Sequence, residues 1–167
     1  MQLAVAEILN LAVEKRAPAV YLVGHSAGGH LVSMLHKTDW SEFSVTQEAQ
    51  QKLKDVFSIA GLFDIRPLVN SFVNDSINMS SLAAEKVSPL LSGFPSNQTL
   101  SHLHLIVPEF DTPEFFRQTK EYHAKVIENQ QKCSIFLASR CDHLDVIENL
   151  LDENNDVLAY LLKHMNA

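Results

Sequence analysis

The sequence predicts an α/β fold with a mainly parallel sheet of about four strands flanked by helices. Short apolar, β-branched runs alternate along the chain with longer segments of helical periodicity, which is typical of a parallel sheet with right-handed crossovers. A serine between two glycines stands where the first strand is expected to give way to a helix. At 167 residues, the chain lies in the usual range for a single domain, which we expect to span 1–167.

Hydrophobic periodicity indicates where each element lies. The opening segment carries apolar residues at helical spacing, and Pro18 is expected to end that helix. The run AVYLVG at 19–24 follows and is predicted to be a fully buried strand. The other strands are expected at 56–61, 103–108 and 133–138, and the helices at 3–16, 27–37, 113–130 and 144–164.

Residues 62–100 interrupt the alternation of strands and helices. This stretch is rich in Ser, Asn and Pro, and only short helical pieces are predicted in it. In an α/β fold, an insertion at the carboxyl edge of the sheet usually covers the active site. We therefore expect 62–100 to form a cap-like insertion within the single domain.

Composition excludes several classes of partner. The net charge is -7 and the basic residues are scattered, which argues against a nucleic-acid surface. Cys133 and Cys141 form neither a disulfide framework nor a CxxC motif, so they favour a reducing compartment. No segment approaches the ~18 uncharged apolar residues that a membrane span needs. We expect a cytoplasmic protein that acts on a small molecule and binds neither nucleic acid nor membrane.

The segment Gly24-His25-Ser26-Ala27-Gly28 matches the pattern G-x-S-x-G. It lies between a predicted strand and a predicted helix, where a sharp turn strains the serine and presents its hydroxyl as a nucleophile. Bulky side chains at either glycine are expected to clash in that turn. The helix amino terminus favours developing negative charge, so the N–H of Ala27 is expected to be an oxyanion donor. The alternative is a glycine-rich turn without chemistry.

A nucleophilic serine needs a general base and an acid that orients it. On this type of sheet the chain order is serine, acid, histidine, each after a strand. Asp111 follows the strand at 103–108, and His143 follows the strand at 133–138. The sequence therefore predicts a catalytic triad of Ser26, Asp111 and His143.

Two alternatives remain open for the acid. Asp111 can instead cap the helix that begins at Pro113, unless Thr112 takes that position. Asp64, which follows the strand at 56–61, is the rival acid. His143 has the alternative of being a solvated surface histidine.

Other residues near the serine are expected to shape the pocket, namely His25, Gly28 and His30. His102 and His104 share one strand face at a spacing that a metal could use. Because no carboxylate or cysteine partner is evident, they are interpreted as surface residues and no metal site is predicted. Ordinary positions on helix surfaces are predicted for the remaining histidines, His36, His123 and His164.

Four segments together resemble kynurenine formamidase, also called arylformamidase, a family of α/β-hydrolases. They are GHSAGGHL (24–31), KVSPLL (86–91), EFDTPEFFRQTKEYH (109–123) and DHLDVIENL (142–150). The resemblance runs from about residue 19 to the carboxyl terminus. It implies hydrolysis of N-formyl-L-kynurenine to kynurenine and formate in tryptophan catabolism, with no metal or cofactor. The implied triad agrees with the one predicted from the motif.

The chain departs from that family at its amino-terminal end. Family members carry an HGG-type segment after an earlier strand, whose N–H groups complete the oxyanion hole, and no HGG occurs here. We therefore expect a truncated chain, the carboxyl-terminal half of the α/β-hydrolase fold. One edge of the strand at 19–24 is then expected to be open, which favours self-association.

Two other functions are consistent with the same residues. A carboxylesterase of the hormone-sensitive-lipase type shares the GHSAGG segment. Alternatively, the chain is an inactive, truncated form that acts only by binding a partner.

Overall fold

A four-stranded sheet forms the centre of the computed structural model, in which residues 1–95 and 100–166 are described. The strands lie in chain order and all three neighbouring pairs are parallel. This confirms the predicted α/β class. The strands are β1 (Val20–His25), β2 (Leu53–Ile59), β3 (His102–Pro108) and β4 (Cys133–Ala138).

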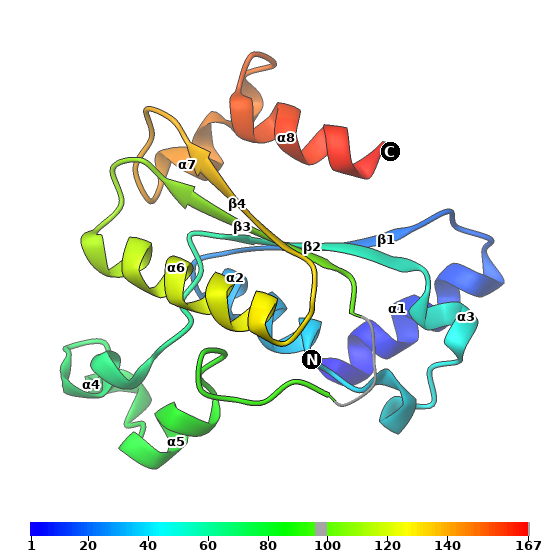
Figure 1. Ribbon diagram of the computed structural model, residues 1–167, viewed down its shortest axis with the longest axis horizontal. Helices are drawn as coiled ribbons and strands as arrows, with labels where there is room; N and C mark the ends of the chain where they lie inside the picture. Colours follow the sequence, from blue (N-terminus) through cyan, green and yellow to red (C-terminus); the bar gives the residue numbers. More distant parts are fainter. Residues whose placement is uncertain (96–99, 167) are drawn as a thin grey trace.

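Helices cover both faces of the sheet (Figure 1). One face carries α1 (Gln2–Glu14), α2 (Ala27–His36) and α6 (Pro113–Glu128), and the other carries α8 (Asp156–Met165). The remaining helices are short: η1 (Trp40–Phe43), α3 (Gln47–Gln50), η2 (Arg66–Asn70), α4 (Asn74–Ile77), α5 (Ser81–Lys86), α7 (Asp145–Glu148) and η3 (Asn149–Leu151). Among the described residues, no helix is long and apolar enough to cross a membrane.

Each face of the sheet has its own apolar core. Alternate side chains of a strand point to opposite faces, so β2 and β3 contribute to both. Leu9 of α1 and Tyr122 of α6 are fully buried on one face. Phe57 and Ile106 of the sheet are buried on the other face, together with Val157 of α8. The inner strands β2 and β3 are therefore held rigidly from both sides.

The prediction of a fully buried first strand is wrong. No residue of β1 is buried, and Val23 is 47% exposed. The reason is position: β1 pairs with β2 along one edge and is the terminal strand of the sheet as described. The open edge expected from the sequence is therefore present in the described part of the chain.

The single helix predicted over 144–164 is also wrong, because the structure divides it into α7, η3 and α8. The break falls at Asp152–Asn155, where short polar side chains compete with the helix for backbone hydrogen bonds. The side chain of Asn155 accepts a hydrogen bond from the N–H of Leu158 and so caps α8.

Other differences are small. Strand β2 begins at Leu53 rather than at residue 56, and the short helices η1 and α3 were not predicted. The described part of 62–100 contains η2, α4 and α5, while residues 96–99 lie outside the described residues. The role of this segment as a cap stays a prediction.

Candidate active site

Ser26 lies at the turn between β1 and α2 with φ 55° and ψ -115°. A positive φ is costly for a residue other than glycine, so neighbouring structure must hold it. The N–H of Ser26 donates to the carbonyl of Ile59 at 2.9 Å, and the Ser26 carbonyl accepts from the N–H of His30 at 3.0 Å. The strained serine is thus fixed on both sides by backbone hydrogen bonds.

The two glycines of the motif have different roles. A Cβ at Gly24 would lie 2.1 Å from the carbonyl oxygen of Gly28, a backbone atom that cannot turn aside. A Cβ at Gly28 would meet nothing within 4 Å. The expectation of a clash is confirmed at Gly24 and wrong at Gly28, because the close approach involves only the Gly28 backbone.

The structure brings Ser26, His143 and Asp111 together in one hydrogen-bonded chain. His143 Nε2 lies 2.9 Å from Ser26 Oγ, and His143 Nδ1 lies 2.9 Å from Asp111 Oδ2. The Asp111 side chain is 2% exposed and the His143 side chain is 29% exposed. A buried acid behind a partly open imidazole is the arrangement that orients a general base toward a nucleophile.

The loops that carry Asp111 and His143 are joined to each other. The N–H of Glu109 donates to Ala138 O at 2.9 Å, and the N–H of Phe110 donates to Cys141 O at 3.1 Å. The Glu109 carboxylate also accepts from the N–H of Arg140 at 2.7 Å. The acid and the base therefore lie on one connected unit at the carboxyl ends of β3 and β4.

Asp111 is not the N-cap residue of α6, which was the alternative to its role as the acid. Thr112 occupies the N-cap position of α6. One oxygen of Asp111, Oδ1, accepts from the N–H of Thr112 at 2.8 Å, and the other faces His143. Asp142, beside His143, caps its own loop by accepting from the N–H groups of Leu144 and Asp145.

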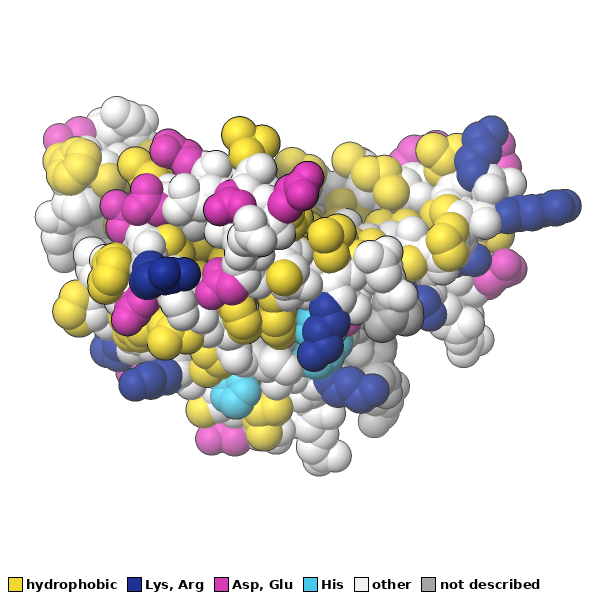
Figure 2. Space-filling view, turned by 90° about the horizontal axis from the view of Figure 1, so that it is seen from above, with side chains coloured by type: hydrophobic (Ala, Val, Ile, Leu, Met, Phe, Trp, Pro, Cys, Tyr) yellow, Lys and Arg dark blue, Asp and Glu magenta, His cyan; other side chains and the backbone are white. Residues whose placement is uncertain are grey.

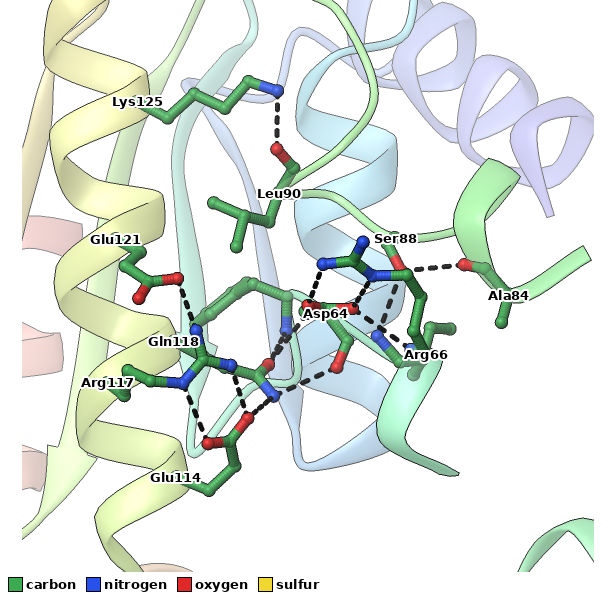
Figure 3. A network of polar contacts seen from close by, with 12 residues as sticks. Asp64, Arg66, Ala84, Ser88, Leu90, Glu114, Arg117, Gln118, Glu121 and Lys125 are labelled. Atoms are coloured by element: carbon green, nitrogen blue, oxygen red, sulfur yellow. Dashed lines mark hydrogen bonds and ion pairs between the residues drawn. The ribbon is translucent and has the colours of Figure 1, made fainter. Parts of the chain in front are cut away.

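Asp64, the rival acid, belongs to a different network (Figure 3). Its carboxylate accepts from Arg66 Nε at 3.0 Å and from Arg66 Nη2 at 2.8 Å, and these hydrogen bonds lower the pKa of Asp64. The side-chain amide of Gln118 on α6 bonds to the backbone of Phe63 and Asp64. Asp64 therefore holds the segment after β2 against α6 and does not contact His143.

The predicted oxyanion donor and pocket residues lie next to Ser26 in β1 and the first turns of α2. Ala27 is exposed and is the first residue of α2. Its backbone N–H has no hydrogen-bond acceptor among the described residues. His25 Nε2 lies 2.7 Å from the backbone oxygen of His143. His30 Nε2 lies 2.7 Å from the backbone oxygen of Val87, which ties α2 to the segment after α5.

Phe115 is a neighbour of the base that the sequence analysis missed. Its ring centroid lies 4.8 Å from that of His143. The signal was available in principle, since Phe115 lies in the first turn of the helix predicted to begin at Pro113, directly after the loop that carries Asp111. An aromatic side chain here gives the site an apolar wall.

The surface assignment is wrong for His104, whereas His102 is partly exposed. His104 is fully buried, and its Nε2 lies 3.1 Å from Asp55 Oδ1. Asp55 pairs with His102 in the register of β2 and β3, and this carboxylate was not visible without the register. Burial lowers the pKa of His104 to about 4 and also lowers that of His102.

Two further histidines differ from the prediction of ordinary helix-surface positions. His36 is 1% exposed, and its Nε2 lies 2.8 Å from the backbone oxygen of Ser101. His164 on α8 packs with its ring centroid 4.4 Å from that of His104. Both were misassigned because they lie on helix faces that cover the sheet.

The sequence is similar to those of known kynurenine formamidases. No family model matches the chain. Kynurenine formamidase of Danio rerio is 34% identical over 146 residues, 86% of this chain and 48% of that protein. The Salmo salar kynurenine formamidase is 33% identical over 150 residues, 87% of this chain and 49% of that protein. The chain spans about half the length of the curated relatives it matches.

Solved structures show the same fold. A protein from Silicibacter sp. TM1040 that is assigned as a thioesterase aligns with TM-score 0.68 and 25% identity, over 99% of this chain and 57% of that one. An α/β hydrolase from the metagenome of Lake Arreo aligns with TM-score 0.65 and 15% identity, over 98% and 56%. The chain therefore has the α/β-hydrolase fold and is homologous to kynurenine formamidases over about half of their length.

Proposed function

We propose that this chain carries the catalytic triad of a serine hydrolase that cleaves the formamide of N-formyl-L-kynurenine or a related aryl formamide. The observation that carries the proposal is the hydrogen-bonded series Ser26–His143–Asp111, with both contacts at 2.9 Å. The identity to kynurenine formamidases supports the choice of a formamide substrate.

The chemistry follows from that series. Ser26 Oγ attacks the formyl carbon while His143 Nε2 takes its proton, and Asp111 stabilises the imidazolium. The C–N bond then breaks as His143 returns the proton to the departing aryl amine. Water, deprotonated by His143, attacks the formyl ester on Ser26, and formate leaves as Ser26 regains its proton. The sequence of steps uses no metal and no cofactor.

The oxyanion is assigned to the N–H of Ala27. Ala27 is an exposed residue in the first turn of α2, and its N–H has no acceptor within the described residues. A single donor of this kind contributes about 2.7–4 kcal/mol to stabilising the transition state.

The matching experiment compares the chain with its Ser26→Ala variant. We expect the parent chain to be labelled by a fluorophosphonate probe and to release formate from N-formyl-L-kynurenine. Both activities should be abolished in Ser26→Ala. Ser33→Ala, a buried serine on the same helix, is the matched control and should retain labelling. Labelling that survives Ser26→Ala would remove this residue as the nucleophile.

Substrate class is tested separately. Turnover of N-formyl-L-kynurenine compared with p-nitrophenyl acetate distinguishes a formamidase from a carboxylesterase. A preference for the ester, with Ser26 still required, would keep the triad and refute the formamide assignment. Loss of both activities with correct folding would favour a form that acts only through a partner.

The same proposal includes a location and a mode of association. Cys133 and Cys141 are both free thiols, and Cys141 is buried, which supports a reducing compartment such as the cytoplasm. The open edge of β1 supports self-association of the chain.

A further inference from the structure

A second cluster of chemically active side chains lies away from Ser26, between the sheet and α8. It consists of Asp55 at the start of β2 and His102 and His104 at the start of β3. Tyr21 pairs with Asp55 and His25 pairs with Ile59, so the cluster lies four residues, about 13 Å, back along the strands from the serine turn. It therefore belongs to the opposite end of the sheet.

We propose that Asp55, His102 and His104 form a binding site for Zn²⁺. One potential ligand atom from each of these residues lies within 4.8 Å of the others. Two histidine nitrogens and one carboxylate oxygen are a ligand set that zinc accepts. In a tetrahedral site, ligand atoms about 2.0–2.1 Å from zinc are about 3.3 Å apart. The pair His104 Nε2 and Asp55 Oδ1 already stands at 3.1 Å.

The outer hydrogen bonds of the two histidines are those of metal ligands. A coordinating histidine holds its second ring nitrogen on a hydrogen-bond partner, which fixes the orientation of the ring. His104 Nδ1 lies 2.8 Å from the hydroxyl of Tyr160, which leaves Nε2 facing Asp55. His102 Nε2 lies 2.8 Å from Ser134 Oγ, which leaves Nδ1 for a metal. Both rings are thus oriented by side chains that do not need to move.

The position of the cluster also suits an ion. His104 is fully buried, but Asp55 retains 15% exposure of its side chain and His102 is partly exposed, so an ion can reach the three ligands from solvent. The face that carries α8 shows scattered charges among hydrophobic side chains, and histidines reach its surface (Figure 2). A hydrogen-bonded Asp55–His104 pair alone would not require His102 beside it, with its ring centroid 4.0 Å from that of His104.

Occupation of the site would fasten α8 to the sheet. Tyr160, which bonds to His104, is on α8, as is His164, whose ring lies 4.4 Å from His104. Zinc bound by residues of β2 and β3 would fix His104 and therefore its contact with α8. We expect three protein ligands and one water, and a rise in thermal stability that depends on zinc concentration.

The test is calorimetric titration of the full chain, stripped of metal by a chelator, with Zn²⁺. We expect one ion per chain, with affinity reduced at least about 100-fold in His102→Ala and in Asp55→Asn. Both substitutions leave the buried His104 in place. His123→Ala, a histidine on α6, and His143→Ala are controls that should bind zinc as the parent chain does.

Each other outcome overturns the proposal. Absence of saturable binding refutes it directly. Binding that disappears in His143→Ala would place the ion at the triad, and binding unchanged in His102→Ala and Asp55→Asn would place it elsewhere. If either variant fails to fold, nitrogen NMR of the parent chain decides: the ring resonances of His102 and His104 must shift on addition of Zn²⁺. This site is independent of the proposed hydrolase activity.

Discussion

The imidazole of His25 donates a hydrogen bond to the backbone carbonyl of His143, with Nε2 2.7 Å from the oxygen. The two rings lie 4.9 Å apart between their centroids. The residue before the serine therefore anchors the loop that carries the base, independently of the contact between Ser26 and His143. His25 is a positioning residue in this arrangement.

Replacing His25 by Ala should lower kcat about fivefold, because one hydrogen bond of about 1 kcal/mol that fixes the base is lost. KM for the substrate should change little. His25→Gln, whose amide can donate to the same carbonyl, should retain most of the activity. Steady-state kinetics of both variants test this, and equal losses in Ala and Gln would show that the hydrogen bond does not position the base.

Asp111→Asn should lower kcat by about 10⁴, because the amide no longer holds the required tautomer of His143. Asp64→Asn should reduce activity less than about tenfold, since Asp64 pairs with Arg66 and not with the base. Circular dichroism controls for folding. If Asp64→Asn loses more activity than Asp111→Asn, the assignment of the acid is reversed.

The glycines of the serine turn should respond differently to a methyl group. Gly24→Ala should destabilise the fold by about 1–3 kcal/mol, because the Cβ would collide with the Gly28 carbonyl. Gly28→Ala should be neutral or stabilising by up to about 1 kcal/mol, since Gly28 lies in α2 with open space around it. Urea denaturation measures both, and comparable losses would show that the turn tolerates neither.

Acidification should destabilise the protein through His36. The pKa of His36 is lowered from 6.5 to about 4, mainly by burial and also by the charges of Lys37 and His102, while the hydrogen bond to the Ser101 backbone opposes this shift. Between these pH values the unfolded chain binds more protons than the folded one. Stability therefore rises with pH across this window and is lost as pH falls from 6.5 to 4, by about 3 kcal/mol.

The matched variant for that prediction is His36→Gln, which keeps a donor for the Ser101 carbonyl but does not titrate. Urea denaturation at several pH values between 7 and 4 should show a smaller slope in the variant. An unchanged slope would mean that other groups carry the pH dependence.

Self-association should depend on the open edge of β1. Val23 on this strand and Ile127 on α6 are both 47% exposed, which makes them a matched pair. Sedimentation velocity at micromolar concentration should show association of the parent chain, reduced in Val23→Lys because an edge charge opposes strand pairing. Ile127→Lys should associate like the parent. Equal behaviour of the two variants would exclude β1 as the contact.

The site could be predicted from local sequence because its parts are local. The strand–serine–helix turn has a five-residue signature, and Asp111 and His143 each lie in the loop that follows an apolar strand. The carboxyl ends of parallel strands meet at one edge, so three separate loops could be placed together without coordinates. The interruption of the last helix after Leu151 also has a local cause, the polar residues 152–155, although the sequence analysis predicted a continuous helix there.

What could not be predicted depends on register and on neighbours. Asp55 lies before the run that was recognised as a strand, and only the pairing of β2 with β3 places it beside His102. The burial of His36 depends on Ser101, 65 residues away, whose carbonyl it contacts. The exposure of β1 is a property of the sheet edge, because the strand itself has the composition of an inner one.

The strands lie in space in the order in which they occur in the chain, β1-β2-β3-β4. During synthesis, each strand that leaves the ribosome can therefore pair with the strand made just before it. Ser26 follows β1 and Asp111 follows β3, but His143 comes only after β4. In the proposed mechanism, Ser26 therefore stays an inert hydroxyl in a nascent chain until β4 and His143 have emerged, so hydrolysis depends on the last of these four strands.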